Sequence, residues 1–299
     1  MRSLHGSPRQ ASSLMHLETP SLTCPLTHAY SLEAGVKDIA ALTAAAPRIT
    51  PGSTISIPYL AGQDDEARLS SMRAVRGLGF EPMPHISARR VGSRAELETF
   101  VQRAIAEAGV KRCFVIAGDP STPIGPFSDS AALIDTGVLE HAGIQVVGVG
   151  GHPESHPFMG TAERWNVLER KCRSIEQRGM MPLIVTQFAF DADVVLTWLT
   201  ALRERGIEHP VRVGVPGPAG VAVLARYAAL CGVSACASVW AKYGLSIGKL
   251  FGTAGPDLFV DRLASGLTEA HGDVHLHFFP FGGIAQSVKW IEQYRARGE

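Results

Sequence analysis

The sequence has few cysteines, no excess of either charge and no long apolar run. Its 299 residues include five cysteines, an odd number without the spacing of a disulfide framework, so we interpret them as small core residues in a reducing cytosol. The 28 basic residues balance the 28 acidic ones, and the longest basic cluster is Arg89-Arg90, too little for a nucleic-acid-binding face. No apolar run approaches the ~20 residues of a membrane-spanning helix. These absences predict a cytoplasmic protein without a nucleic-acid or membrane partner.

The first 26 residues differ in composition from the rest of the chain. They are rich in Ser, His and Pro and contain no hydrophobic segment. Such a composition is typical of a loose terminal arm rather than of a targeting sequence or a core element. We therefore expect an N-terminal arm at residues 1–26 and one catalytic domain at residues 27–299.

From residue 27 onward, eight short apolar segments alternate with segments of helical periodicity. The apolar segments span residues 28–35, 53–60, 81–87, 111–119, 144–154, 181–191, 210–218 and 273–283. Helical patterns follow each of them, including one at 128–143 and a longer stretch at 234–268 with an internal Gly-rich break. Strands that are apolar on both faces and alternate with helices form parallel sheets covered by helices. Eight such units predict an α/β fold, a single-domain (β/α)₈ TIM barrel.

A doubly wound open sheet is the alternative architecture. It usually carries a G-x-G-x-x-G motif directly after its first strand, where the motif receives a dinucleotide. Residues 31–38 read SLEAGVKD and lack this motif. The sequence therefore favours the barrel.

Polar and ionisable residues gather at the ends of the predicted strands. In a barrel the active site lies at the carboxyl ends of the strands. Taken singly, each residue there has an ordinary structural explanation: Glu33 could stabilise a helix N-terminus, and Asp119 could form an Asx turn. Their convergence on one end favours a binding or catalytic site. The residues are Glu33 after the first strand, His85, Arg89 and Arg90 after the third, Asp119 after the fourth, His152, Glu154 and His156 after the fifth, and Thr186, Gln187 and Asp191 after the sixth.

The stretch VGVGGHPESHP at residues 147–157 also raises two metal-site hypotheses. The His152-Pro153-Glu154 tripeptide matches the H-x-E half of a zinc deaminase, which also needs P-C-x-x-C. Cys231 and Cys236 lack that proline and that spacing. A zinc site built from His152, His156 and a third ligand is the second hypothesis, but a four-residue gap on a loop fixes no geometry. We expect no metal.

Several motifs together resemble one enzyme family. In order, they are GDPS at 118–121, GGHPESHP at 150–157, ERK at 169–171, IVTQFAFDAD at 184–193, GIEHPVRVGVPGP at 206–218 and ARYAALCGV at 225–233. Over roughly residues 30–235 this order and spacing resembles the methylenetetrahydrofolate reductase family. The resemblance implies a TIM barrel that reduces 5,10-methylenetetrahydrofolate to 5-methyltetrahydrofolate. The hydride would come from NADH or NADPH through bound FAD, in one-carbon metabolism and methionine biosynthesis, in a possible homo-oligomer.

The resemblance also implies roles for individual residues. Glu33 corresponds to the general acid that protonates N10 of the folate and opens its five-membered ring. Asp119 corresponds to the aspartate beside flavin and pterin, and Gln187 to the glutamine that binds the pterin, with Thr186 and Phe190 as further substrate contacts. The implied cofactor-binding residues are His85, Asp119, His152, Glu154, His156, Arg170 and Lys171.

Three departures from the family pattern bear on the flavin. Ala117 stands where much of the family has arginine, and His152 where it usually has tyrosine. The proline-rich segment after the first-strand glutamate is missing. These departures leave two versions of a reductase, one with an altered FAD mode and one in which NAD(P)H delivers hydride directly. A folate-dependent methyltransferase-like barrel and a non-catalytic folate-binding barrel are the alternative functions.

Overall fold

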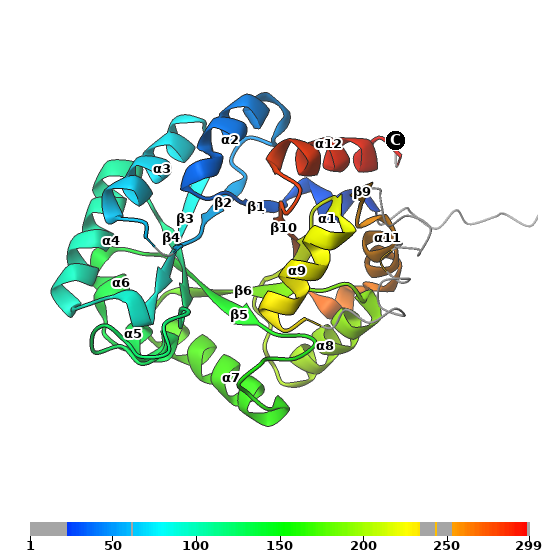
Figure 1. Ribbon diagram of the computed structural model, residues 1–299. Helices are drawn as coiled ribbons and strands as arrows, with labels where there is room; N and C mark the ends of the chain where they lie inside the picture. Colours follow the sequence, from blue (N-terminus) through cyan, green and yellow to red (C-terminus); the bar gives the residue numbers. More distant parts are fainter. Residues whose placement is uncertain (1–22, 61, 234–242, 244–252, 298–299) are drawn as a thin grey trace, which may run out of the picture.

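Eight parallel strands close into a barrel in the computed structural model, which describes residues 23–60, 62–233, 243 and 253–297 (Figure 1). Neighbours around the barrel follow the order β1-β10-β7-β6-β5-β4-β3-β2. Closure through the pairing of β1 with β10 confirms the predicted barrel and excludes the open sheet. The strands are β1 (Ser31–Glu33), β2 (Thr54–Ile57), β3 (Glu81–Ser87), β4 (Arg112–Ile116), β5 (Val146–Gly151), β6 (Met181–Phe188), β7 (Val211–Pro216) and β10 (Val274–Phe279).

Helices form the outer ring around these strands (Figure 1). They are α1 (Thr23–His28), α2 (Ile39–Ala45), α3 (Asp65–Gly77), α4 (Arg94–Ala108), α5 (Ser130–Ile134), α6 (Val138–Ala142), α7 (Thr161–Gln177), α8 (Ala192–Glu204), α9 (Val221–Cys231), α11 (Asp257–Gly266) and α12 (Ile284–Arg295). Short 3₁₀ turns span Val36–Asp38, Ala46–Arg48, Ala88–Arg90 and Glu269–His271. A separate antiparallel pair joins β8 (Ala219–Gly220) to β9 (Thr253–Ala254).

Local sequence signals explain where several helices begin. Asp64, Ser93, Asp129 and Asp191 precede α3, α4, α5 and α8, and each side chain accepts a hydrogen bond from a backbone N–H of the first turn. This N-cap bond satisfies one of the donors that a helix start leaves without an intrahelical partner. Strand and helix are thereby joined by short, well-defined turns.

Period-two alternation along the strands separates two hydrophobic cores. The larger core lies between strands and helices and includes Leu32, Ile55 and Ile86. A smaller cluster fills the barrel interior and consists of Met83, Val146, Leu183 and Val185, with Phe114 packed against it. Successive side chains of a strand point to opposite faces, so residues two apart share the interior face. Following Met83 toward the carboxyl end of β3, the next interior residue is His85.

The structure differs from the sequence prediction at three places. The segment 128–143 forms two short helices, α5 and α6, because Gly137 between them adopts the left-handed backbone with φ of 82°. The expected arm ends inside α1, in which Leu26 is buried, while residues 1–22 lie outside the described residues. Most of the expected helical stretch 234–268 is also outside them, and its described part contains β9 and α11.

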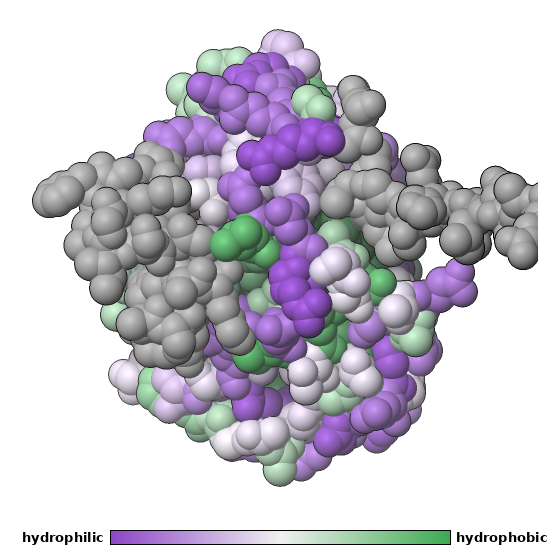
Figure 2. Space-filling view, turned by 90° about the vertical axis from the view of Figure 1, so that its right-hand side faces the viewer, coloured by the Kyte–Doolittle hydropathy of each residue, from purple (hydrophilic) through white to green (hydrophobic). Residues whose placement is uncertain are grey.

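The outer surface mixes residue types. On the face shown in Figure 2, hydrophilic residues predominate and hydrophobic ones are scattered among them. Cys113 and Cys172 are buried, as expected of core residues, and Cys231 is partly buried. Within the described part of the chain, no helix has the length and apolarity that a membrane span requires.

We predict that Gly214 on β7 tolerates no side chain. The β6–β7 pairing is irregular between Val185 and Phe188, and a Cβ on Gly214 would lie 2.6 Å from the carbonyl oxygen of Thr186. Gly214→Ala is expected to lower the free energy of unfolding by about 1–3 kcal/mol, the usual cost of overpacking. Chemical denaturation of the wild type and the variant measures this difference in the free energy of unfolding.

The matched control is Gly77→Ala at the end of α3, where a Cβ meets nothing within 4 Å. Alanine favours a helix over glycine, so this variant should be neutral or slightly more stable. Equal stability of the two variants would contradict the close approach at Gly214.

Candidate active site

Glu33 ends β1 with its carboxyl group largely removed from water. Its side chain is 19 % exposed. Burial disfavours the charged form, and the nearby negative charge of Asp38 acts in the same direction. Together they raise the pKa of Glu33 from 4.5 to about 7. A carboxylic acid with this pKa holds a proton near neutral pH and can donate it to a bound molecule.

His85, on the interior face of β3, lies beside this acid. Its Nε2 atom is 3.9 Å from Oε1 of Glu33 and has no hydrogen-bond partner among the described residues. Burial lowers the pKa of His85 to about 3, and the positive charges of His277 and Arg68 would oppose its protonation further. Arg68 also donates a hydrogen bond to the carbonyl oxygen of His85. The imidazole is therefore neutral, and it adds no positive charge that would lower the pKa of Glu33.

A second buried histidine, His277 on β10, completes the polar interior. Its Nδ1 atom is 2.8 Å from Oγ of Ser31, and burial lowers its pKa to about 3. We did not predict His277 or Ser31 as site residues. The alternation in VHLHFF at 274–279 was the available signal, because it places His275, His277 and Phe279 on one face of the last strand.

Gln187 lies at the bulge of β6, and Thr186 holds that bulge in place. The Thr186 hydroxyl accepts a hydrogen bond from the Gly214 backbone N–H and donates one to the Gln187 carbonyl oxygen. The Gln187 side-chain oxygen accepts one from the Phe188 N–H. Thr186 is 1 % exposed, and both of these hydrogen bonds join its hydroxyl to backbone groups. Its described contacts therefore position the backbone of the bulge. The side-chain amide of the half-buried Gln187 retains its two N–H donors.

Aromatic rings form one wall of this end of the barrel. Phe279 contacts the ring of His277 edge-on at 4.8 Å, and Phe281 stacks on Tyr227 of α9 at 4.0 Å. Phe188 contacts both Phe279 and Phe281. Phe190, one of the expected substrate contacts, lies behind this wall and is fully buried. Planar rings stack favourably on such surfaces.

Helix α9, yellow in Figure 1, brings its last residue close to the acid. Burial raises the pKa of the Cys231 thiol, and the charge of Glu33 raises it further. This coupling requires the two side chains to be near each other. The polar group formed by Glu33, His85 and His277 is thus bordered by the aromatic wall and by the end of α9.

The loop after β5 holds two neutral histidines. The rings of His152 and His156 meet edge-on at 4.7 Å. Burial lowers the pKa of His152 to about 3, and the positive charges of His156, Lys171 and Arg164 add to the effect. Arg164 of α7 donates hydrogen bonds to the carbonyl oxygens of His152 and Glu154, which fixes the loop. These hydrogen bonds therefore hold the loop after β5 in a defined conformation beside the barrel end.

The two cationic side chains expected to contact flavin phosphates, Arg170 and Lys171, lie in different surroundings. Arg170 is exposed on α7, in an open groove with Arg173 and Arg178 beside Asp135. Lys171 is 7 % exposed, and burial lowers its pKa to about 8. The Asp119 side chain is 70 % exposed and paired with Arg90, whose hydrogen bonds lower the pKa of Asp119. Of these three expected contacts, Lys171 is the one whose charge acts on the histidines of the loop after β5.

The metal-site hypotheses also lack a donor set. Among the residues that the structure describes, no group of three or more His, Cys, Asp or Glu side chains is placed to hold a metal ion. Cys236, the second cysteine of the deaminase-like hypothesis, lies outside the described residues.

Two of the solved structures similar to this chain are enzymes of other kinds. One is 3-dehydroquinate dehydratase from Aquifex aeolicus, with a TM-score of 0.47, 11 % identity and coverage of 90 % of this chain and 97 % of that one. The other is dihydropteroate synthase from Thermus thermophilus, with a TM-score of 0.48, 13 % identity and coverage of 88 % and 93 %.

Sequence comparisons identify the family. The chain is 25 % identical over 145 residues to methylenetetrahydrofolate reductase 2 of Saccharomyces cerevisiae, and this segment covers 46 % of the chain but 24 % of the yeast protein. The methylenetetrahydrofolate reductase family model matches residues 32–276, most of the barrel described above. The chain therefore belongs to the methylenetetrahydrofolate reductase family.

Proposed function

We propose that this protein reduces 5,10-methylenetetrahydrofolate to 5-methyltetrahydrofolate with NADH or NADPH as the hydride donor. The observation that carries the proposal is the position of the Glu33 carboxyl group at the end of the barrel, where burial raises its pKa to about 7. Family membership supports a folate-related oxidoreductase. The assignment of substrate, hydride donor and acid to this chain is our own.

The reaction needs one proton and one hydride. Glu33 donates its proton to N10 of the folate, the bond from N10 to the bridging methylene carbon breaks, and an iminium forms at N5. A hydride from the reduced nicotinamide then adds to the methylene carbon, which gives the N5-methyl group and NAD(P)⁺. The protein contributes the proton donor and holds the two reactants in line.

The surroundings of Glu33 suit this sequence of steps. The neutral His85 and His277 keep the site polar without a charge that would make Glu33 release its proton in advance. The N–H donors of Gln187 are suited to acceptor atoms on the edge of a pterin. The rings of Phe279, Phe281 and Tyr227 offer a stacking surface for the pterin or the nicotinamide.

Direct transfer from the nicotinamide is the version that we favour. The family generally uses FAD together with NAD(P)H. In this chain Ala117 supplies no charge, Arg170 faces an open groove outside the barrel, and the Lys171 side chain is buried. A pyrophosphate needs cationic or N–H donors around it, and neither the exposed Arg170 nor the neutral Ala117 provides one at the barrel end. We therefore assign no step to FAD.

We predict that the isolated protein oxidises NADH or NADPH in the presence of methylenetetrahydrofolate without added flavin. Protein freed of flavin is assayed with each donor, with and without FAD, and its absorption spectrum is recorded. Equal turnover in both cases and a spectrum without flavin bands are expected. Turnover that depends on FAD contradicts direct transfer, and no turnover in any condition contradicts the proposed reductase.

Replacing the acid is expected to remove most of the activity. Glu33→Gln keeps the size of the side chain but cannot donate the proton, so kcat should fall by about 100-fold or more, the usual scale of general acid catalysis. The control is Glu98→Gln, an exposed carboxylate on α4 that is paired with Arg94. Unchanged kcat in Glu33→Gln would exclude Glu33 as the acid.

The pH dependence of kcat tests the protonation state of Glu33. Because its raised pKa is about 7, the proton-donating form dominates below that pH and is lost above it. The rate should therefore fall about tenfold per pH unit on the alkaline side. His85 and His277, with pKa values of about 3, stay neutral throughout this range. A kcat that does not change between about pH 6 and about pH 9 would contradict the assignment of Glu33 as the acid.

A further inference from the structure

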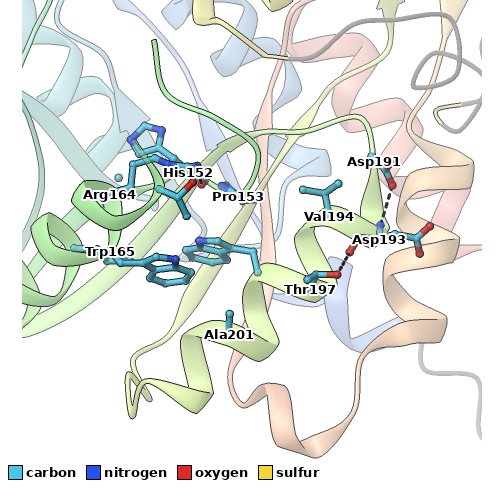
Figure 3. Close-up of a pocket in the computed structure, with 13 residues that line it drawn as sticks. His152, Pro153, Arg164, Trp165, Asp191, Asp193, Val194, Thr197 and Ala201 are labelled. Carbon is cyan, nitrogen blue, oxygen red and sulfur yellow. Dashed lines mark hydrogen bonds between the residues drawn. The ribbon is translucent and has the colours of Figure 1, made fainter. Parts of the chain in front are cut away.

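The charged side chains that line a groove of about 380 Å³ between α7 and α8 already have structural partners (Figure 3). Asp191 accepts a hydrogen bond from the Asp193 backbone N–H and caps α8. The Asp193 carboxylate is paired with Arg262 of α11, and Arg164 holds the loop after β5. The packing of the helices and the loop therefore explains these charged residues. A buried arginine of another helix, Arg68 of α3, instead has a partner in the candidate active site.

Arg68 occupies a position of α3 where helical periodicity favours an apolar residue. Arg68, Met72 and Val75 have the spacing of residues on one helical face, and all three are buried. The Arg68 side chain is 3 % exposed, and burial lowers its pKa because it disfavours the charged form. A guanidinium removed from water in this way requires compensating contacts.

The contacts of Arg68 hold its guanidinium group in one place. Nη1 donates a hydrogen bond of 3.0 Å to Asp65, one turn earlier in α3. The guanidinium carbon lies 4.0 Å from the centre of the Tyr59 ring and 4.3 Å from that of Phe100 in α4. A guanidinium that stacks on aromatic faces keeps its in-plane N–H donors for other partners. One of these donors, on Nη2, bonds to the carbonyl oxygen of His85.

The bond from Arg68 to His85 fills a gap in the barrel sheet. The N–H of Glu81, the first residue of β3, donates to the carbonyl oxygen of Ser53, just before β2. Along a strand, the backbone groups of every second residue face the same neighbour, so those of Glu81 and His85 both face β2. Strand β2 ends at Ile57, opposite the residue before His85. Arg68 therefore supplies the donor that a longer β2 would have provided.

This bond fixes the backbone from which the His85 imidazole projects. Phe114 of the neighbouring strand β4 contacts the same ring edge-on, with the ring centroids 4.8 Å apart. Nε2 of His85 thereby lies 3.9 Å from Oε1 of Glu33. We propose that Arg68 is a positioning residue that acts through His85, by holding the imidazole against the acid and keeping water away from the carboxyl group. The proposal rests on the proposed function, which assigns Glu33 as the acid.

The charge of Arg68 acts on His85 and not directly on the acid. It opposes protonation of His85, whereas the raised pKa of Glu33 has burial and the charge of Asp38 as its causes. A change in the pKa of Glu33 in an Arg68 variant would therefore report a change at His85. The described charged or titratable groups that face this pair are Asp38 after β1, Arg68 of α3, Cys231 of α9 and His277 of β10.

Loss of Arg68 should lower the pKa of Glu33. An imidazole that is no longer held admits water to the carboxyl group, and hydration favours the ionised form. Without the charge of Arg68, His85 also accepts a proton more readily, and an imidazolium beside a carboxylate acts in the same direction. Glu33 then loses its proton at a lower pH. The loss of kcat should therefore be large above neutral pH and should shrink as the pH falls.

The test uses two substitutions of Arg68 and one matched control. Arg68→Met fills the space beside the aromatic rings but has no donor, and Arg68→Lys keeps the charge and an N–H donor. The control is Arg76→Met in the same helix. Arg76 bonds to Glu81 at the start of β3 and to the carbonyl oxygens of Ala108 and Gly109. It is a structural arginine at the other end of the same strand.

The readouts are kcat between about pH 6 and about pH 9 and the titration of the Glu33 carboxyl group. The titration is followed by NMR of protein labelled with carboxyl-¹³C glutamate, and Glu33→Gln identifies the signal. We expect Arg68→Met to lower the Glu33 midpoint by about one pH unit and kcat at about pH 8 by about tenfold. Arg68→Lys should recover most of both. Arg76→Met should lose stability but keep the wild-type midpoint.

An unchanged Glu33 midpoint in folded Arg68→Met overturns the proposal, and so does an equal shift in Arg76→Met, because general loosening would then suffice. If Arg68→Met does not fold, the deciding variant is Asp65→Asn, which removes the charged partner of Arg68 at a partly exposed position. It should lower the midpoint by a smaller amount, and an unchanged midpoint overturns the proposal.

The NMR titration requires no turnover, so it separates this proposal from the proposed function. If the wild type has no reductase activity but the Glu33 midpoint depends on Arg68, the proposed function is rejected and the positioning role stands. If the reductase is active and the midpoint does not depend on Arg68, the positioning role alone is rejected.

Discussion

The pairing of β1 with β10 closes the barrel, and β1 contributes only three residues to it. Ser31 lies opposite His277 in this pairing, and their side chains are joined by a hydrogen bond. Leu32 fills the outer core, while Glu33 is paired with Ser56 of β2 on the other side. The contact that closes the fold therefore also fixes the acid and a neutral histidine at one end of the barrel.

Burial is the common physical cause of the pKa shifts of the ionisable groups at this end of the barrel. The same loss of water raises the pKa of Glu33 and lowers those of His85 and His277. At neutral pH the two histidines are consequently uncharged, and Glu33 exchanges between its protonated and ionised forms. A site of this type can exchange hydrogen bonds and a proton with a polar heterocycle without holding a fixed ion pair. The aromatic wall around Phe279 and Phe281 keeps one side of it apolar.

The fold could be predicted because the periodicity of the apolar residues and the number of apolar segments can be read directly from the sequence. Eight apolar segments in alternation with helices leave few architectures, and the strand ends locate Glu33, His85, His152 and Gln187 at one end. What the sequence could not give were contacts that depend on packing. The exposure of Asp119 and Arg170 and the burial of Phe190 follow from how helices and loops pack against the barrel.

Other features escaped prediction for local reasons. His277 lies in an apolar segment whose composition is typical of a core strand. Thr186 forms its hydrogen bonds at a bulge that no sequence pattern predicts. Trp165 of α7 and Trp198 of α8 stack on each other, a contact that helical periodicity alone does not predict.

The shortness of β1 also limits how this chain can vary in length. Side chains on a strand alternate between faces, so the insertion of one residue between Ser31 and Leu32 would exchange the faces of the residues that follow it. Leu32 would then point into the polar interior and the carboxyl group into the helix layer. Related chains with the same chemistry should therefore differ by substitution within β1, and by gain or loss of residues only in the connections on either side of it.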